Sequence, residues 1–565
     1  MTRDASIVLA GQAGQGIETI ESVLTRVLLA SGYNVFATKE YMSRVRGGQN
    51  STEIRIGPTP VQAHVDRIDV LMPLDQGSLE RLLPRISKDT LVLCDEGVCV
   101  DAGMTVNVPV TSTATAIGNK IFTNTVAMGV VCGLLGADVG LLREQVRKVF
   151  STKDPGIIEK NVAAVNKGND LGRELVSSGK VELSTGKTGG TRDTILVNGA
   201  EAIALGAIAG GCNFIASYPM SPSTAVLASL AAKTQDFDII AEQAEDEIAA
   251  VNMAIGAWYA GAKAMITTSG GGFALMTEGV SLAGMIESPL VLHVAQRPGP
   301  ATGLPTRTEQ GDLNLVLHAG HGEFPRVIFA PATIEDGFTL AAKAFNIADK
   351  YQVPVFLLSD QYYVDSYYNV PPFNDDGIEV VDAVVETQKD YKRYTFVPDG
   401  ISPRGVPGHG DGLVLVDSDE HDEEGHITED FNIRTAMVDK RLRKLDAFDA
   451  DAVSPHVHGK GGGGVLVVGW GSTYHAIHEA LQRLDDDRVA HLHFTQLYPL
   501  PPGTRDRLEA ATTRILIEGN ATGHFGQLLG QHAGVTFHHE ILKYSGEPFS
   551  VEELATAMTN ILGGA

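Results

Sequence analysis

Residues 6–16 read SIVLAGQAGQG and set a pattern that the rest of the chain repeats. The apolar run at 6–10 has the length of a buried strand, and a glycine-rich turn follows it. Residues 17–30 then have helical spacing, and 33–37 form the next apolar run. Strand, glycine turn, helix and strand in this order predict an α/β fold.

The alternation recurs along the chain. A second unit opens on residues 195–199, and a helix rich in small residues is expected at 248–259. Further strands are expected at 70–72, 90–93, 264–268, 289–295, 354–358, 465–468, 490–494 and 515–518. We therefore predict three successive Rossmann-like, parallel-sheet α/β domains, over residues 1–185, 192–375 and 461–565, with an irregular acidic connector at 376–460. Ligands are expected at the carboxyl ends of the strands.

The net charge of −25 argues against nucleic acid and anionic membranes as partners. No apolar run approaches a membrane span, and the N-terminus lacks a signal-peptide core. The four cysteines, Cys94, Cys99, Cys132 and Cys212, have no CxxC spacing and no metal-type grouping with histidine. We expect a cytoplasmic enzyme that holds no iron–sulfur cluster of its own.

Four stretches together resemble the α subunit of 2-oxoacid:ferredoxin oxidoreductases. They read YPMSPST at 218–224, EDEIAAV at 245–251, TTSGGG at 267–272 and QRPGPATGLPT at 296–306. The N-terminal region, with GQAGQG at 11–16 and SRVRGGQ at 43–49, is similar to the family's γ domain, here fused ahead of α. The C-terminal region resembles its transketolase-C-like domain. The resemblance covers nearly the whole chain.

Glu247 is the residue that the resemblance identifies as the activator of thiamine diphosphate. A carboxyl beside the aminopyrimidine must exchange a proton with the ring, and a dry setting favours this. Glu247 precedes a stretch of small apolar residues that would let a helix pack against a flat ring. The alternative is an acidic first-turn residue, a role that suits Glu245 and Asp246 better.

The resemblance also implies the substrate site. Tyr218 and Pro219 would border thiamine, and Ser221, where the family usually has Thr, would offer its hydroxyl to a substrate carboxylate; the alternative for Ser221 is a helix cap. Arg297 would bind the 2-oxoacid carboxylate, unless it forms a structural ion pair. Thr306 and Arg307 follow on a loop that covers the substrate in the family. Arg307 would meet a distal carboxylate or remain in solvent.

The γ-like region implies a coenzyme A contact. Its backbone amides at Gly11, Gly14 and Gly16 follow a strand and can bind phosphate, with Arg44 and Arg46 as partners or as solvated loop residues. The spacing GxxGxG differs from the dinucleotide fingerprint, which disfavours a nicotinamide dehydrogenase.

Three conspicuous stretches are interpreted as structural. Residues 418–426 (SDEHDEEGH) resemble a metal-ligand tract, but such acidic connectors mostly bind water. Residues 518–527 resemble a family loop at a subunit contact, so His524 is not expected to be catalytic. Residues 410–412 (GDG) lie in the connector and not between a strand and a helix, so they are not taken as the family's Mg²⁺ motif.

A partner must therefore complete the enzyme. We expect a β subunit with the Mg²⁺ and diphosphate sites and a [4Fe–4S] cluster that passes electrons to ferredoxin, in an (αβ)₂ assembly. The predicted reaction converts 2-oxoglutarate and coenzyme A to succinyl-CoA and CO₂, with the direction left open between oxidation and reductive carboxylation. The alternatives are a pyruvate or broad 2-oxoacid specificity, the related indolepyruvate enzyme, and a non-catalytic scaffold subunit.

Overall fold

The computed structural model describes residues 4–12, 16–42, 48–98, 102–181, 185–459 and 464–563. The chain divides into two compact units, and we describe each by itself. The first consists of Met1–Asn198, Asp365–Pro372 and Ser550–Glu553, and the second of Gly199–Val364, Phe373–Phe549 and Leu554–Ala565. No described helix has the length and apolar character needed to cross a membrane.

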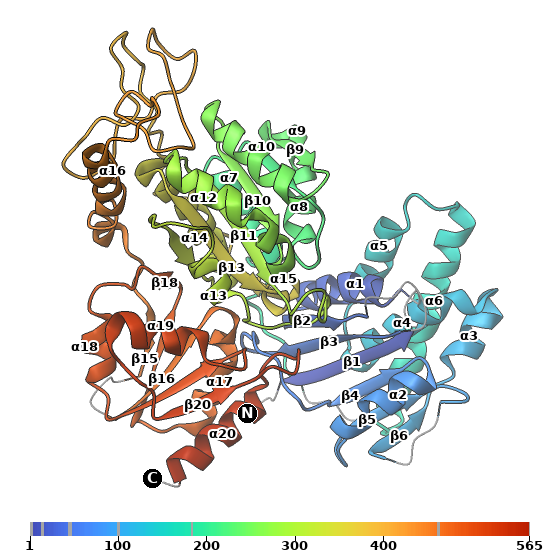
Figure 1. The fold of residues 1–565 in the computed structure, drawn as a ribbon. Coiled ribbons are helices and arrows are strands. Elements are labelled where there is room, and N and C mark those ends of the chain that lie inside the picture. The colour runs from blue at the N-terminus through green and yellow to red at the C-terminus, as the bar shows by residue number, and fades with distance from the viewer. Residues whose placement is uncertain are drawn as a thin grey trace. The chain divides into compact units, whose positions relative to one another are not determined.

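The first unit contains an eight-stranded sheet in the order β6-β5-β4-β1-β3-β2-β14-β7. Figure 1 labels its strands β1 to β6. Its strands are β1 (Ala5–Gln12), β2 (Asn34–Glu40), β3 (Gln49–Gly57), β4 (Val70–Pro73), β5 (Leu91–Cys94), β6 (Met104–Asn107), β7 (Ile195–Asn198) and β14 (Tyr367–Val370). Its helices are α1 (Ile17–Ala30), α2 (Gln76–Leu82), α3 (Val110–Ile117), α4 (Thr123–Leu135), α5 (Val139–Val149) and α6 (Pro155–Ser177), with short turns η1 (Leu83–Arg85) and η2 (Lys120–Phe122).

The expectation of parallel pairing is correct for only half of this sheet. Strands β1, β4, β5 and β6 pair in parallel, but β3 runs antiparallel to both β1 and β2. Strand β3 has no apolar run to reveal it, because it buries Glu53 and Arg55. Arg85 donates to Glu53 at 2.9 Å, and Arg55 donates to Asp4 at 2.6 Å. Strand β7, expected to open the second sheet, pairs here with β14.

The second unit contains a seven-stranded sheet in the order β18-β12-β13-β11-β10-β8-β9. Its strands are β8 (Phe214–Ser217), β9 (Ile240–Gln243), β10 (Ala264–Thr268), β11 (Leu290–Gln296), β12 (Val327–Phe329), β13 (Pro354–Asp360) and β18 (Gln496–Tyr498). All pair in parallel except β18, which extends the sheet antiparallel to β12. The helices are α7 (Gly199–Ala209), α8 (Thr224–Ala231), α9 (Thr234–Phe237), α10 (Glu247–Tyr259), α11 (Gly270–Phe273), η3 (Ala274–Met276), α12 (Thr277–Met285), α13 (Leu313–Leu317), α14 (Ile334–Tyr351) and α15 (Gln361–Asp365).

A five-stranded sheet, ordered β15-β17-β16-β19-β20, belongs to the same unit. Its strands are β15 (His456–His458), β16 (Val465–Trp470), β17 (Val489–Phe494), β19 (Thr513–Glu518) and β20 (His539–Leu542), and its helices are η5 (Gly471–Thr473), α17 (Tyr474–Leu484), α18 (Thr504–Glu509), α19 (His524–Ala533) and α20 (Val551–Gly563). One continuous apolar core joins residues of both sheets, which confirms the α/β class with three sheets.

The connector is less irregular than predicted. It contains α16 (Phe431–Arg443) and the short turn η4 (Phe448–Asp451). Helix α16 buries Met437, Lys440 and Arg441, so its inward face is largely charged and shows no apolar period in the sequence. This composition is the physical reason that the helix was missed.

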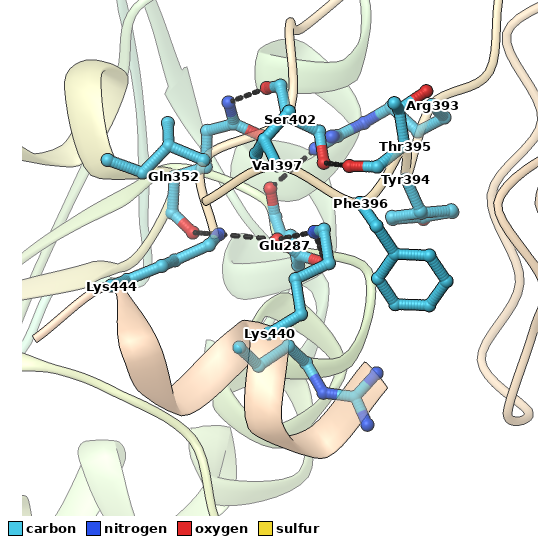
Figure 2. A network of polar contacts seen from close by, with 12 residues as sticks. Glu287, Gln352, Arg393, Tyr394, Thr395, Phe396, Val397, Ser402, Lys440 and Lys444 are labelled. Carbon is cyan, nitrogen blue, oxygen red and sulfur yellow. Dashed lines mark hydrogen bonds and ion pairs between the residues drawn. The ribbon is translucent and has the colours of Figure 1, made fainter. Parts of the chain in front are cut away.

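A buried charge network holds α16 against the seven-stranded sheet's domain (Figure 2). Lys440 Nζ donates to the two Glu287 carboxylate oxygens at 2.7 and 2.9 Å, and Lys444 Nζ lies 2.6 Å from Oε2. Arg393 donates to the Glu287 carbonyl at 2.7 Å. Burial raises the pKa of Glu287, but these cations outweigh it and hold that pKa well below its usual range. Burial lowers the pKa of Lys444 to about 8.

Removing the central charge tests this anchor. Glu287→Gln leaves two lysines buried without a counter-charge, so the free energy of unfolding of the second unit should fall by about 3–5 kcal/mol in chemical denaturation. Glu159→Gln is the control, because its partner Arg147 and Glu159 itself are 50% and 63% exposed and should contribute nothing measurable. Equal stability of the two variants would show that the network does not anchor the connector.

Candidate active site

Glu247 is the first residue of α10, but it does not cap the helix. Asp246 occupies the N-cap, and its Oδ1 accepts a hydrogen bond from the Ala249 amide at 2.7 Å. Glu245 and Asp246 are exposed, whereas Glu247 is only 4% exposed. Asp246 is therefore the cap, and Glu247 is the acidic residue of the first turn, where the helix dipole favours it as the alternative states. The helix dipole does not require the burial of Glu247.

The Glu247 carboxyl faces a glycine turn. A Cβ placed on Gly272 would overlap Oε1 of Glu247 and Oγ1 of Thr268, so glycine is required for the carboxyl to lie where it does. Oε1 is buried and has no hydrogen-bond partner among the described residues. Burying an unpaired carboxyl oxygen is costly, which makes it a candidate for binding a ligand's polar atom.

Arg297 and Ser221 lie together, on the loops that follow β11 and β8. The Arg297 guanidinium donates from Nη1 to the Ser221 carbonyl at 2.6 Å. Among the described residues no carboxylate is paired directly with Arg297, although the charge of Asp312 acts on it. Burial lowers the pKa of Arg297, and the charge of Asp312 opposes this. Ser221 is exposed, and the N-cap of α8 is Ser223, so Ser221 is not a helix cap.

A chain of buried hydrogen bonds fixes the strands beneath these residues. Thr267 and His293 Nδ1 lie 2.7 Å apart, and His293 Nε2 lies 2.7 Å from the Ser359 hydroxyl. Gln296 donates to the Ser359 carbonyl at 3.1 Å. Burial lowers the pKa of His293 to about 3, so the imidazole is neutral and links β10, β11 and β13 without adding charge.

The loop from Arg297 to Asp312 is held at its far end by the five-stranded sheet's domain. Thr308 donates its amide to the Gly546 carbonyl at 3.1 Å. Gln310 exchanges backbone and side-chain hydrogen bonds with Gly519, at 2.6 and 2.8 Å, and donates to the Trp470 carbonyl at 2.9 Å. Arg307 packs its side-chain stem against Gly546, and Thr306 beside it is half-buried.

Three residues of this region were missed by the sequence analysis: Gly272, Gln310 and Asp312. Gly272 lies inside a quoted motif, but only the position of Glu247 shows why it must be glycine. Gln310 and Asp312 lie just beyond the motif that ends at Thr306. In the sequence, the only indication of Asp312 is an acidic residue shortly after the motif at 296–306, and such an indication is weak.

The remaining predicted residues are distributed as follows. Tyr218 is 41% exposed, and Pro219 is half-buried directly after β8. In the first unit, Gly11 lies in β1 and Gly16 is the residue before α1, with φ 76°. Gly14, Arg44 and Arg46 lie outside the described residues, so their predicted role with coenzyme A stays a prediction.

The stretches interpreted as structural make internal contacts. Glu420 of the acidic tract pairs with Arg441 at 3.0 Å and also with Arg434. No group of three or more His, Cys, Asp or Glu side chains in the described part of the chain is arranged to hold a metal ion. Glu518 is fully buried and accepts from Trp470 Nε1 at 2.6 Å and from the Phe525 amide at 2.7 Å. Burial raises its pKa to about 7.

The glycine turn gives a test of this geometry. Gly272→Ala inserts a methyl group into the space of the Glu247 carboxyl, and such overpacking should lower the free energy of unfolding by about 1–3 kcal/mol. Gly271→Ala in the same turn is the matched control, because its Cβ would lie 3.7 Å from the Ala301 carbonyl oxygen, an ordinary contact. Chemical denaturation of both variants should separate them, and equal stability would mean that Glu247 does not lie against Gly272.

Two family models match the chain. Residues 6–171 match the family described as pyruvate ferredoxin/flavodoxin oxidoreductase. Residues 205–440 match the one described as pyruvate flavodoxin/ferredoxin oxidoreductase, thiamine diphosphate-binding. The second match contains Glu247, Arg297 and the glycine turn.

Similar proteins align over nearly the full length. A 2-oxoacid:ferredoxin oxidoreductase subunit alpha from Sulfolobus sp is 30% identical over 625 aligned positions, covering 99% of this chain and 97% of that subunit. The 2-oxoglutarate synthase subunit KorA of Archaeoglobus fulgidus is 35% identical over 310 positions, covering 54% of this chain and 82% of that subunit.

A solved structure has the same fold throughout. The 2-oxoglutarate:ferredoxin oxidoreductase from Magnetococcus marinus, with 2-oxoglutarate, coenzyme A and succinyl-CoA bound, superposes with a TM-score of 0.92 at 27% identity, covering 99% of this chain and 100% of that one. Because both the sequence and the fold agree from end to end, the chain belongs to the family of 2-oxoacid:ferredoxin oxidoreductase α subunits, in the form that fuses a γ domain ahead of α.

Proposed function

We propose that this chain is the α subunit of a 2-oxoglutarate:ferredoxin oxidoreductase, which converts 2-oxoglutarate and coenzyme A to succinyl-CoA and CO₂ and delivers electrons to ferredoxin. The buried, unpaired Oε1 of Glu247 is the observation that carries the proposal. The bound oxoacid in the Magnetococcus marinus enzyme and the name of the Archaeoglobus fulgidus relative favour 2-oxoglutarate within the family.

The residues present fit thiamine diphosphate. When bound, this cofactor supplies the electron sink that lets a 2-oxoacid lose CO₂. Glu247 would hold a proton at Oε1 and share it with the cofactor's pyrimidine nitrogen, and its dry surroundings strengthen that hydrogen bond. Gly272 leaves the carboxyl room, and Tyr218 and Pro219 follow the neighbouring strand end.

The substrate's carboxylate fits Arg297. The guanidinium gives one N–H to the Ser221 carbonyl, which fixes its position while leaving its other donors for an anion. The exposed Ser221 hydroxyl lies beside it, and Thr306 follows on the same loop. Arg307 is assigned to the distal carboxylate of 2-oxoglutarate, a group that pyruvate lacks.

A β subunit would complete the site, with Mg²⁺, the diphosphate pocket and a [4Fe–4S] cluster. Cys94, Cys132 and Cys212 are separate, buried free thiols, and Cys99 lies outside the described residues. Exposed apolar side chains on α10 support docking there: Ile248, directly after Glu247, is 51% exposed, and Met253 is 40% exposed. Coenzyme A is assigned to the γ-like region because of the glycine-rich sequence at residues 11–16.

Removing the Glu247 proton donor tests the catalytic assignment. In the α/β complex, Glu247→Gln keeps the shape but cannot exchange the proton, so CO₂ release should fall by about 10²–10⁴-fold while the complex still assembles. Glu245→Gln, at an exposed position two residues away, should keep normal turnover. Near-normal turnover of Glu247→Gln would refute the role.

The oxoacid preference has its own test. Release of CO₂ from 2-oxoglutarate, pyruvate and 2-oxoisovalerate should be fastest with 2-oxoglutarate. Arg307→Ala should raise KM for 2-oxoglutarate about 10–100-fold, because a charged hydrogen bond is lost, and should leave KM for pyruvate within about twofold. An equal effect on both substrates would remove Arg307 from the distal site, and a preference for pyruvate would favour the pyruvate-specific alternative.

A further inference from the structure

Asp312 stands where an aspartate normally caps a helix, yet it does not cap one. It is the N-cap residue of α13, and its side chain accepts no hydrogen bond from that helix. Its backbone amide donates instead to Gln296 Oε1 at 2.9 Å, which fixes the residue beside the end of β11. The usual structural reason for an aspartate at this position is therefore absent.

The Asp312 carboxylate points at the same glycine turn as Glu247. A Cβ on Gly270 would overlap both Asp312 carboxylate oxygens, as a Cβ on Gly272 would overlap Glu247 Oε1. Asp312 Oδ2 is buried and has no hydrogen-bond partner within the described ranges. Two carboxyls with unpaired, buried oxygens thus lie at either end of a three-glycine segment.

Two charged groups act on Asp312, and both come from the loop after β11. Burial and, to a smaller extent, the charge of Glu309 raise the pKa of Asp312 to about 6, against the opposing charge of Arg297. The residues of α11 (GGGF) and α13 (LNLVL) carry no charge, and Gln296 is neutral. The ionisation of Asp312 is therefore linked to whatever binds Arg297.

We propose that Asp312 is a proton-dependent positioning residue of the oxoacid site. In the empty site the Asp312 carboxylate is not paired directly with Arg297, but the positive charge of Arg297 still favours its ionised form. When a substrate carboxylate binds Arg297, its negative charge offsets the positive charge that favours ionised Asp312, and Asp312 takes up one proton from solvent. When the carboxylate departs as CO₂, Asp312 releases that proton. This inference rests on the proposed role of Arg297 as the carboxylate ligand.

The consequence is a pH dependence of substrate binding with a defined sign. The substrate binds best when Asp312 is protonated, so affinity is highest below pH 6 and weakens as pH rises. Both carboxylates of 2-oxoglutarate are ionised throughout this range and add no titration of their own. In the α/β complex, KM for 2-oxoglutarate should rise about tenfold between about pH 6 and about pH 7.5.

Asp312→Asn is the test, because it imitates the protonated side chain in size and charge. In the Asp312→Asn variant, KM for 2-oxoglutarate should change by no more than about twofold between about pH 6 and about pH 7.5. At about pH 7.5 this KM should be lower than that of the unmodified enzyme. Asp430→Asn is the matched control: Asp430 caps α16 with hydrogen bonds of 2.8 and 3.0 Å, so it tests the same substitution at a true N-cap. In the Asp430→Asn variant, KM for 2-oxoglutarate should change with pH as it does in the unmodified enzyme. An unchanged pH dependence in Asp312→Asn would overturn the proposal.

A direct proton measurement covers the case in which Asp312→Asn assembles poorly. The unmodified complex, mixed with oxamate in weak buffer containing a pH-indicator dye, should take up a fraction of one proton per site at neutral pH. No uptake would overturn the proposal. If the complex releases CO₂ from 2-oxoglutarate but KM does not change with pH, only the role of Asp312 fails. If it releases CO₂ from no 2-oxoacid, the proposed function fails first.

Discussion

A carboxyl oxygen kept away from water without a protein partner is the constraint on which the second unit depends. Glu247 is buried at the start of α10, and Asp246 performs the capping that a first-turn acid would otherwise share. Gly272 has no side chain because the carboxyl occupies that space. Such a group lowers stability unless a ligand satisfies it, and this is why the proposed function assigns a ligand's polar atom to it.

The loop from Arg297 to Asp312 depends on parts of the chain that are distant in sequence. It begins at Arg297, fixed to Ser221 after β8, and its later residues are bound to the five-stranded sheet's domain through Gln310 and Thr308. The neutral His293 ties the strands beneath it. The five-stranded sheet's domain therefore has a positioning role, because it holds one end of the loop that carries Thr306 and Arg307.

Sequence reasoning succeeded where apolar periodicity was strong. Helix α1 has the predicted bounds of 17–30, and strand β10 has the predicted bounds of 264–268. It failed where buried charges replace apolar side chains, as in β3 with Glu53 and in α16 with Lys440, because pattern analysis treats such residues as exposed. The sequence also does not single out Asp312. This residue stands out only because its side chain makes no capping hydrogen bond and because its carboxylate lies against Gly270, and both facts require the structure.

The central claim is that the Glu247 carboxyl faces the pyrimidine of thiamine diphosphate in the assembled α/β enzyme. The most direct measurement is the separation between a Glu247 carboxyl oxygen and the pyrimidine ring nitrogen N1′ in a structure of the cofactor-loaded complex. The account predicts a hydrogen bond of about 2.6–3.0 Å. A Glu247 carboxyl that faces bulk solvent, or that bonds only to protein groups with the cofactor elsewhere, would contradict it.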